Sequence, residues 1–271
     1  MNSSKITTLK ELIEKAGLER EDYYGIKGRL SNSTFKYFRE CSARAYAVQE
    51  GEHIRPFSSA LVHGSYVDEL LFETFQTVDT SSLYTLKGEL RSDAKYLKTI
   101  VQEIKDDEGF WRYLKGDYQQ QKLFEIEGVP WKGKLDVLPY EFDNMIVDFK
   151  TAKSIDDWAY SERFQQRIPF YYARGYDIQG AVYTHAWEKE RFVLAIATKM
   201  TPSGRYIIEL PREMLDKAMD YVIQYQELVF DQMQGRKLEF CGNESCEYCR
   251  SRKPTILNMA PVISARGESP F

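Results

Sequence analysis

The sequence lacks a hydrophobic stretch that could cross a membrane. None of the apolar runs in its 271 residues approaches the ~18 residues that a spanning helix requires. The opening segment, MNSSKITTLKELIEK, alternates charged residues with isolated aliphatic residues and has no apolar core of the kind found in signal peptides. These absences predict a cytoplasmic protein with no membrane partner.

An excess of positive charge is also missing. The 37 lysines and arginines are outnumbered by 41 acidic residues, which gives a formal net charge of -4. This balance excludes a uniformly basic nucleic-acid coat protein but not a local basic groove. Hydrophobic residues at 43% and charged residues at 29% are globular proportions, so the chain can form one large or two small domains.

Cysteine is scarce, and its placement is uneven. Cys41 stands alone, whereas Cys241, Cys246 and Cys249 follow one another in the pattern C-x4-C-x2-C. Two cysteines separated by two residues bind one metal ion readily, and Cys41 could supply a fourth thiolate for zinc. The alternative is that Cys41 is a small residue of an apolar helix face and that no metal binds. A disulfide is not expected in a cytoplasmic chain.

Hydrophobic periodicity predicts helices first and strands later. Helical spacing covers residues 5–16, 33–50, 58–76, 88–114, 156–187 and 211–235. Ser31 or Ser33 is expected to cap the second of these helices, and the stretch over 156–187 is interrupted near Pro169. Strands are predicted at QQKLFEIEG, PWKGKLDVLPY, DNMIVDFKTA, RFVLAIATK and GRYIIEL. This order predicts an α/β (α+β) fold with a mixed central sheet flanked by helices.

The strongest chemical pattern is Asp136 followed by Asp148-Phe149-Lys150. Residues two apart on a strand share a face, so Asp148 and Lys150 project together, and a hairpin can bring Asp136 beside them. Carboxylates ~4 Å apart repel by about 4 kcal/mol at an effective dielectric near 20. Such a pair shares a proton or binds a cation, and oxygen ligands favour Mg²⁺ or Mn²⁺. The two acids and the lysine together fit metal-assisted phosphodiester hydrolysis. The alternative is that Asp148 and Lys150 form only a surface ion pair.

The run GKLDVLPYEFDNMIVDFKTAKS resembles the core of PDDEXK nucleases, whose fold is restriction-endonuclease-like. Gln179 and Tyr183 resemble the Q-x-x-x-Y motif of the RecB-like branch, and residues 64–68 resemble its G-x-x-x-H motif, with Asp68 in place of histidine. Aligning His63 with that histidine is a second reading, which the spacing from Gly64 disfavours. The chain is most similar to exodeoxyribonuclease VIII (RecE-type) enzymes of phages and prophages.

The resemblance implies a set of site residues. Asp68, Asp136, Asp148 and the carbonyl of Phe149 would bind the metal, and Lys150 would position water or stabilise charge. Gln179 and Tyr183 would contact DNA or orient Lys150. Glu73 is a weaker ligand candidate.

The resemblance also implies a function and partners. We expect a metal-dependent exonuclease that acts on linear double-stranded DNA in phage recombination and leaves single-stranded tails for an annealing protein. A homo-oligomer is plausible by analogy with ring-forming relatives. A related endonuclease or repair nuclease, and a non-catalytic DNA- or protein-binding module, are the alternatives.

In RecB-like nucleases one N-terminal and three C-terminal cysteines hold a 4Fe–4S cluster. By resemblance, Cys41, Cys241, Cys246 and Cys249 would bind this cluster here, although their spacing departs from the commonest form. The other two interpretations of these cysteines, that they bind zinc or that they bind no metal, remain open.

Basic and aromatic residues near the predicted site are candidates for DNA contact. The basic ones are Lys132, Lys134, Arg163, Arg167 and Arg174, and Trp158 and Tyr160 could stack on a displaced base or belong to the core. The predicted domains are an N-terminal helical extension over 1–30, a nuclease domain over 31–250 and a tail over 251–271.

Overall fold

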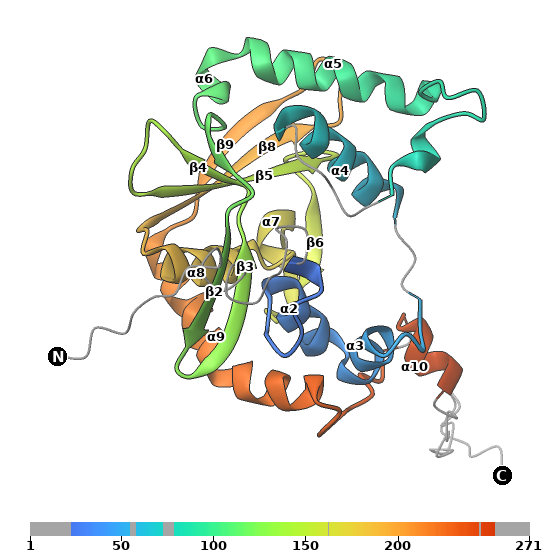
Figure 1. The fold of residues 1–271 in the computed structure, drawn as a ribbon, viewed down its shortest axis with the longest axis vertical. Helices are drawn as coiled ribbons and strands as arrows, with labels where there is room; N and C mark the ends of the chain where they lie inside the picture. The colour runs from blue at the N-terminus through green and yellow to red at the C-terminus, as the bar shows by residue number, and fades with distance from the viewer. Residues whose placement is uncertain (1–22, 55–57, 73–78, 162, 244, 253–271) are drawn as a thin grey trace, which may run out of the picture.

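A five-stranded sheet lies at the centre of the molecule (Figure 1). The computed structural model describes residues 23–54, 58–72, 79–161, 163–243 and 245–252. In spatial order the strands are β1 (Gly116–Tyr118), β4 (Val137–Pro139), β5 (Met145–Ala152), β8 (Arg191–Thr198) and β9 (Arg205–Glu209). The β5–β8 pair is parallel and the other pairs are antiparallel, which confirms the predicted mixed sheet.

Helices cover both faces of this sheet, and two hairpins extend from it. The helices are α2 (Asn32–Glu40), α3 (Ser42–Gln49), α4 (Ser59–Phe72), α5 (Ser92–Asp106), α6 (Glu108–Trp111), α7 (Phe170–Ala173), α8 (Tyr176–Trp187), α9 (Arg212–Met233) and α10 (Glu247–Arg252), with a 3-10 turn at Ser81–Leu83. The hairpins are β2 (Gln121–Ile126) with β3 (Val129–Lys134), and β6 (Trp158–Ser161) with β7 (Gln166–Pro169).

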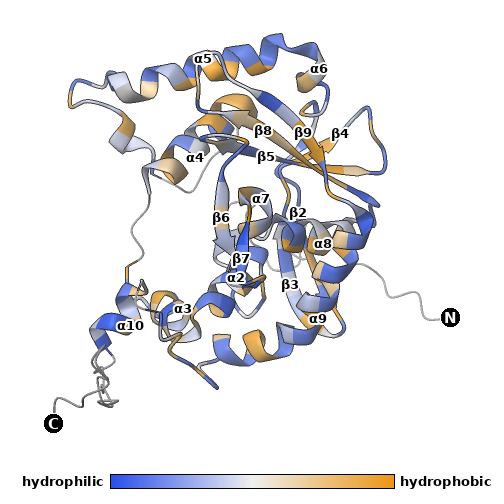
Figure 2. Cartoon of the chain, turned by 180° about the vertical axis from the view of Figure 1, so that it is seen from behind, coloured by the Kyte–Doolittle hydropathy of each residue, from blue (hydrophilic) through white to orange (hydrophobic). Residues whose placement is uncertain are grey.

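The two central strands are buried on both faces because their alternate residues enter two different cores. Ile146 of β5 and Leu194 of β8 join the core under α2, α8 and α9. Val147 and Phe149 of β5, with Val193 of β8, join the core under α4, α5 and α6. Figure 2 shows the corresponding concentration of apolar residues in the central strands. By this alternation Asp148 and Lys150 lie on the α8 face of the sheet.

The single helix predicted over residues 33–50 is wrong, because two helices occupy this segment. Ser31 caps the first helix, α2, as its Oγ accepts a hydrogen bond from the Thr34 amide at 3.2 Å. Cys41 has an extended backbone, with φ -163° and ψ 101°, and it separates α2 from α3. The apolar spacing continues through the break, so periodicity alone does not reveal it.

The helix predicted over residues 156–187 is also wrong in its first half. Trp158–Ser161 and Gln166–Pro169 pair as the β6–β7 hairpin, in which Trp158 lies opposite Pro169 and Tyr160 opposite Arg167. Helical structure begins only at Phe170. Exposed and more buried residues alternate along β6, which is the period of a strand.

The segment PWKGKLDVLPY, predicted as one strand, forms β3 and β4 with a break at Leu135 and Asp136. β3 pairs with β2 in a separate two-stranded sheet, whereas β4 joins the central sheet. The break leaves Asp136 just before β4.

The helix predicted over residues 5–16 lies outside the described residues, and so does Glu73. The domain boundaries at residues 30 and 250 stay predictions. None of the described helices combines the length and the apolar character that a membrane span requires.

Candidate functional site

The candidate site forms where β4 meets β5. Val137 pairs with Val147 in antiparallel register, so Asp136, which directly precedes β4, comes beside Asp148 and Phe149. Oδ2 of Asp136 accepts a hydrogen bond from the backbone N–H of Phe149 at 3.0 Å. The hairpin therefore brings the two predicted acids together from separate strands.

The Lys150 ammonium lies among the three oxygen donors that the sequence predicts as metal ligands on these strands. Its Nζ lies 2.6 Å from Oδ2 of Asp148, 3.0 Å from the carbonyl oxygen of Phe149 and 3.4 Å from Oδ2 of Asp136. Although burial opposes the charge, Asp136 and Asp148 raise the pKa of Lys150 well above its usual range. Lys150 therefore stays cationic and is suited to an electrostatic role rather than to that of a base.

Asp148 is the most confined acid of the site. Its side chain is fully buried, and burial, opposed by Lys150 and supported by Asp136, raises its pKa to about 7. Nε2 of Gln179 on α8 donates a hydrogen bond to its Oδ1 at 2.7 Å. Apart from the Lys150 ion pair, Oδ2 has no hydrogen-bond partner among the described residues. One oxygen is thus held in place, and the other remains available to a cation.

Asp68 lies on α4, which packs against β5, and is near enough to Asp136 and Asp148 for their charges to act on it. Among the described residues the donor atoms of these three acids do not converge as closely as those of the four cysteines. Gly64 of this helix lies against β5, since a Cβ there would be in van der Waals contact with Oγ1 of Thr151 at 3.4 Å. Burial and then the charge of Asp136 raise the pKa of Asp68 well above its usual range. His63 instead faces α5, with Nδ1 3.3 Å from the Tyr96 hydroxyl.

The donor set fits a hard divalent cation. It consists only of carboxylate and carbonyl oxygens, which Mg²⁺ and Mn²⁺ prefer. Burial first, and then the repulsion from the Asp136 carboxylate, raises the pKa values of Asp68 and Asp148, and a bound cation would favour their ionised forms. A magnesium ion keeps several waters, so the three acids need not close a complete shell around it.

Tyr183 lies one helical turn beyond Gln179 on α8, but it does not contact the acids. Its hydroxyl donates a hydrogen bond to the carbonyl oxygen of Lys134 at 2.8 Å. Tyr183 is therefore placed to hold the end of β3 beside the site.

The five basic residues predicted to contact DNA have different surroundings. Lys132 is buried and donates hydrogen bonds to the carbonyl oxygens of Tyr23 at 3.0 Å and Ile26 at 2.7 Å. Arg163 forms an ion pair with Asp177. Both side chains are thus occupied by contacts within the protein, contrary to the expectation that they line a groove.

The other three basic residues, Lys134, Arg167 and Arg174, are better placed to contact DNA. Lys134 lies near enough to Asp68 to influence its pKa. Arg167 and Arg174 are exposed, and the guanidinium of Arg167 donates a hydrogen bond to the Trp158 carbonyl oxygen at 2.7 Å.

Two further lysines near the site were not identified from the sequence. Lys36 of α2 lies near Asp148 and Lys150, and Lys199, just after β8, lies near Asp68 and Arg174. No motif marks either residue, since each reaches the site from a distant part of the chain.

The β6–β7 hairpin exposes aromatic side chains beside a basic one. Trp158 and Tyr160 are 55% and 56% exposed, so they do not belong to the core. They lie two apart on β6, and Arg167 stands directly opposite Tyr160. The hairpin therefore presents flat apolar rings and a guanidinium on one face.

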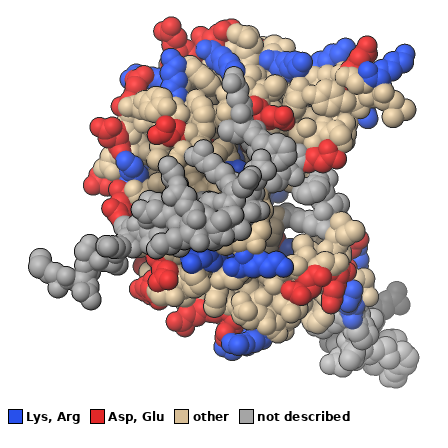
Figure 3. All heavy atoms as spheres, viewed as in Figure 1, with Lys and Arg blue, Asp and Glu red and all other residues tan. Residues whose placement is uncertain are grey.

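Acidic and basic side chains are unevenly distributed over the surface. In Figure 3 lysines and arginines form a row across the lower half of the face, whereas acidic side chains gather along its left edge. The net charge of -4 therefore does not describe every part of the surface.

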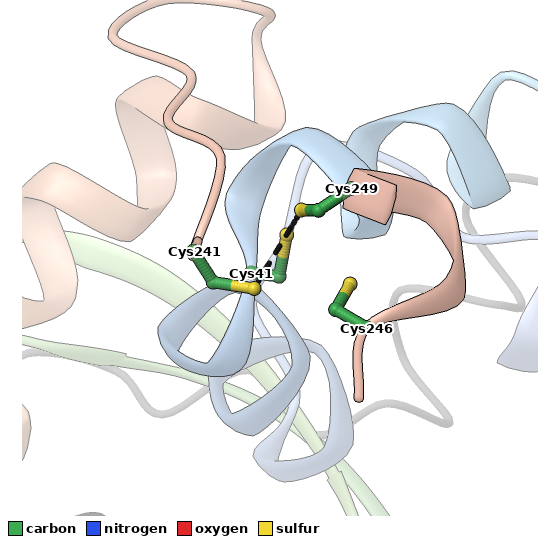
Figure 4. Close-up of side chains that lie close together, drawn as sticks. All are labelled: Cys41, Cys241, Cys246 and Cys249. Carbon is green, nitrogen blue, oxygen red and sulfur yellow. Dashed lines mark hydrogen bonds between the residues drawn. The ribbon is translucent and has the colours of Figure 1, made fainter. Parts of the chain in front are cut away.

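The four cysteines meet at the end of the molecule opposite α5 (Figures 1 and 4). Their sulfur atoms all lie within 4.8 Å of one another, with Cys41 Sγ 3.4 Å and Cys241 Sγ 3.6 Å from Cys249 Sγ. A tetrahedral ion with Zn–S bonds of about 2.3 Å separates its sulfurs by about 3.8 Å. Burial first, then the neighbouring thiols, raises the pKa of Cys249 to about 12. A metal ion would favour the thiolate form.

Comparisons with known proteins identify the family. Residues 31–252 match the family described as "PDDEXK-like domain of unknown function (DUF3799)". A crystal structure of a candidate exonuclease from Eubacterium rectale is 30% identical to this chain, with a TM-score of 0.77, over 88% of this chain and 94% of that chain.

A phage-related exonuclease from Haemophilus somnus 129PT is 16% identical over 80% of this chain and 88% of its own, with a TM-score of 0.38, which is too low to support an argument. No curated protein matches the chain. The match to the family and the fold shared with the Eubacterium rectale protein confirm the predicted PDDEXK resemblance and fold class, and the chain belongs to the family of PDDEXK-like domains.

Proposed function

We propose that the protein is a metal-dependent deoxyribonuclease that hydrolyses linear double-stranded DNA as an exonuclease. The observation that carries the proposal is the convergence of Asp136, Asp148 and the Phe149 carbonyl on one cationic point, the Lys150 ammonium. Oxygen donors that surround one cation at 2.6–3.4 Å can exchange it for a metal ion if the lysine moves aside. The candidate exonuclease from Eubacterium rectale supports the assignment to exonucleases.

Each residue then has a role in the proposed reaction. Asp68, Asp136, Asp148 and the Phe149 carbonyl would hold Mg²⁺ or Mn²⁺, which lowers the pKa of bound water and neutralises phosphate charge. Lys150 positions the attacking water or stabilises charge on the phosphate. Gln179 fixes the Asp148 carboxylate, and its hydrogen bond to Oδ1 leaves Oδ2 for the ligand.

The substrate surface follows from the exposed groups. Lys134, Arg167 and Arg174 would neutralise backbone phosphates. The rings of Trp158 and Tyr160 would stack on bases of an unpaired strand. Lys132 and Arg163 are left out of this surface because both are bound within the protein.

We further propose that the cysteine cluster holds a metal centre. The sulfur spacing is close to that around a single zinc ion, whereas a 4Fe–4S cluster would hold the sulfurs farther apart. Elemental analysis and the visible spectrum of anaerobically purified protein separate the outcomes. Iron with visible absorbance indicates the cluster, zinc without absorbance indicates the single ion, and absence of both metals contradicts the proposal.

The deciding experiment for the activity compares linear and circular DNA with Mg²⁺, Mn²⁺ or EDTA. An exonuclease degrades linear duplexes only, and cutting of circles would instead indicate an endonuclease or a repair nuclease. If both DNA substrates stay intact with Mg²⁺ and with Mn²⁺, the result would favour a non-catalytic binding module. Lys150→Ala and Asp148→Ala should each abolish cleavage while the circular dichroism spectrum stays native.

A role in phage recombination is part of the proposal and predicts two further properties. The products should carry single-stranded tails that a single-strand annealing protein can pair. Light scattering on the purified protein tests whether it forms a homo-oligomer, as processive exonucleases that enclose DNA would require. Intact blunt products would contradict the recombination role without affecting the site.

A further inference from the structure

Lys36 reaches the candidate site from α2. Its stem passes over the turn between α7 and α8, where Gly175 has φ +67° and a Cβ would lie 3.0 Å from the lysine Cδ. The ammonium donates a hydrogen bond to the Arg174 carbonyl oxygen at 3.1 Å. A glycine at this turn therefore leaves room for the lysine, and the turn holds its head group.

The Lys36 ammonium has no counterion of its own. Within the described residues no carboxylate lies within the 4.0 Å of an ion pair, and the hydrogen bond to Arg174 uses one of its three N–H groups. The acids that face it are already bound to other cations: Glu40 to Arg44, Asp148 to Lys150 and Asp177 to Arg163. The remaining donors are therefore available to an anion.

Lys36 and Lys150 both approach the same aromatic ring. Each Nζ lies 5.6 Å from the ring centroid of Tyr176, the first residue of α8. Burial first, then the repulsion from Lys150, lowers the pKa of Lys36 to about 8, against the attraction of the three acids. Two ammonium groups around one ring are mutually unfavourable, and an anion bound between them would remove this cost.

We propose that Lys36 binds a phosphate oxygen of the substrate beside the site of cleavage. This inference rests on the proposed nuclease function and adds a substrate-binding residue outside the motif residues. Lysine suits this ligand because its ammonium is a compact charge with three donors. Lys150 is less available, since its own contacts go to Asp136, Asp148 and the Phe149 carbonyl.

The first test measures duplex binding in EDTA, where no cleavage complicates the equilibrium. Lys36→Met should weaken binding roughly tenfold to a hundredfold, the value of one charge-assisted hydrogen bond. Lys36→Arg should restore most of the affinity at pH 7. Lys98→Met, which removes an exposed lysine of α5, is the matched control and should leave binding unchanged.

The pH dependence adds a readout that a merely structural lysine would not give. Wild-type binding should weaken between pH 7 and pH 9, as the Lys36 ammonium loses its proton near pH 8. Lys36→Arg stays charged over this range and should weaken less. Equal pH profiles for the two proteins would overturn the proposal.

Duplexes with different 5′ ends distinguish the two kinds of phosphate that Lys36 could bind. If Lys36 binds an internal phosphodiester, Lys36→Met weakens binding equally for duplexes with 5′-phosphate and 5′-hydroxyl ends. If it binds a terminal phosphate, the loss is confined to the phosphorylated end. An unchanged affinity for both duplexes overturns the proposal.

A second measurement does not depend on nuclease function. Inorganic phosphate is titrated into protein carrying [13Cε]lysine, and Lys36→Arg identifies the resonance. Phosphate should raise the pKa of Lys36 above about 8. A resonance that does not respond overturns the phosphate site, whereas a response without DNA binding means that the proposed function has failed instead.

Discussion

Replacing Asp148 by Asn should inactivate the proposed nuclease and, at the same time, remove a pH dependence from the stability of the metal-free fold. Asn keeps the shape of the side chain and can still accept the Gln179 hydrogen bond through Oδ1. It removes a carboxylate whose ionised form is disfavoured by complete burial. A bound metal ion would instead favour the ionised carboxylate.

The magnitude follows from the pKa of Asp148, which rises from 3.8 to about 7. The unfolded chain loses this proton near pH 4 and the folded chain near pH 7, so the folded state binds more protons in between. Stability from this group is present below pH 4 and declines by about 1.4 kcal/mol per pH unit up to pH 7. Between pH 5.5 and pH 7 the wild type should lose about 2 kcal/mol relative to Asp148→Asn.

The assay is reversible urea denaturation at pH 5.5 and pH 8, in EDTA and in Mg²⁺. Asp220→Asn, an exposed carboxylate of α9, is the matched control and should show no comparable effect. Mg²⁺ should stabilise the wild type at pH 8 but not Asp148→Asn, by mass action. The reasoning is refuted if the difference between wild type and Asp148→Asn in EDTA is the same at both pH values.

Three further predictions concern other parts of the molecule. Gln179→Met should lower cleavage and move the acidic limb of the pH–rate profile to higher pH, because the Asp148 carboxylate loses a hydrogen bond; an unmoved limb would contradict this role. Trp158→Ala should weaken binding of a single-stranded tail by about 1–3 kcal/mol, measured by fluorescence anisotropy, and leave binding of a blunt duplex nearly unchanged; equal losses would contradict stacking. Cys41→Ser should reduce the metal content of purified protein and lower its melting temperature, and full metal retention would exclude Cys41 as a ligand.

Sequence patterns were most informative where local chemistry and local geometry coincide. The alternation of Asp148, Phe149 and Lys150 on a strand specifies which side chains share a face, and the structure places them so. The hairpin that brings Asp136 to Asp148 is short, so its pairing follows from nearby residues.

Patterns failed where tertiary contacts decide the backbone. Periodicity did not reveal the extended residue Cys41, whose sulfur meets Cys249 from the far end of the chain. Residues 158–169 carry no turn signal strong enough to exclude a helix, yet they pair as a hairpin. The position of Lys132 in the sequence, near the predicted site, suggested a contact with DNA. The sequence does not show that the carbonyl oxygens of Tyr23 and Ile26 bind its ammonium.

Helix α2 connects the two candidate sites. Lys36, in the middle of this helix, approaches the candidate site. Cys41 directly follows the helix C-terminus, where the Cys41 amide donates a hydrogen bond to the Tyr37 carbonyl oxygen at 3.1 Å. A metal bound by Cys41 and the C-terminal cysteines would close a long loop and hold this end of the helix. The cysteine centre would then hold the helix that carries Lys36, so Cys41→Ser should also weaken duplex binding, measured as for Lys36→Met.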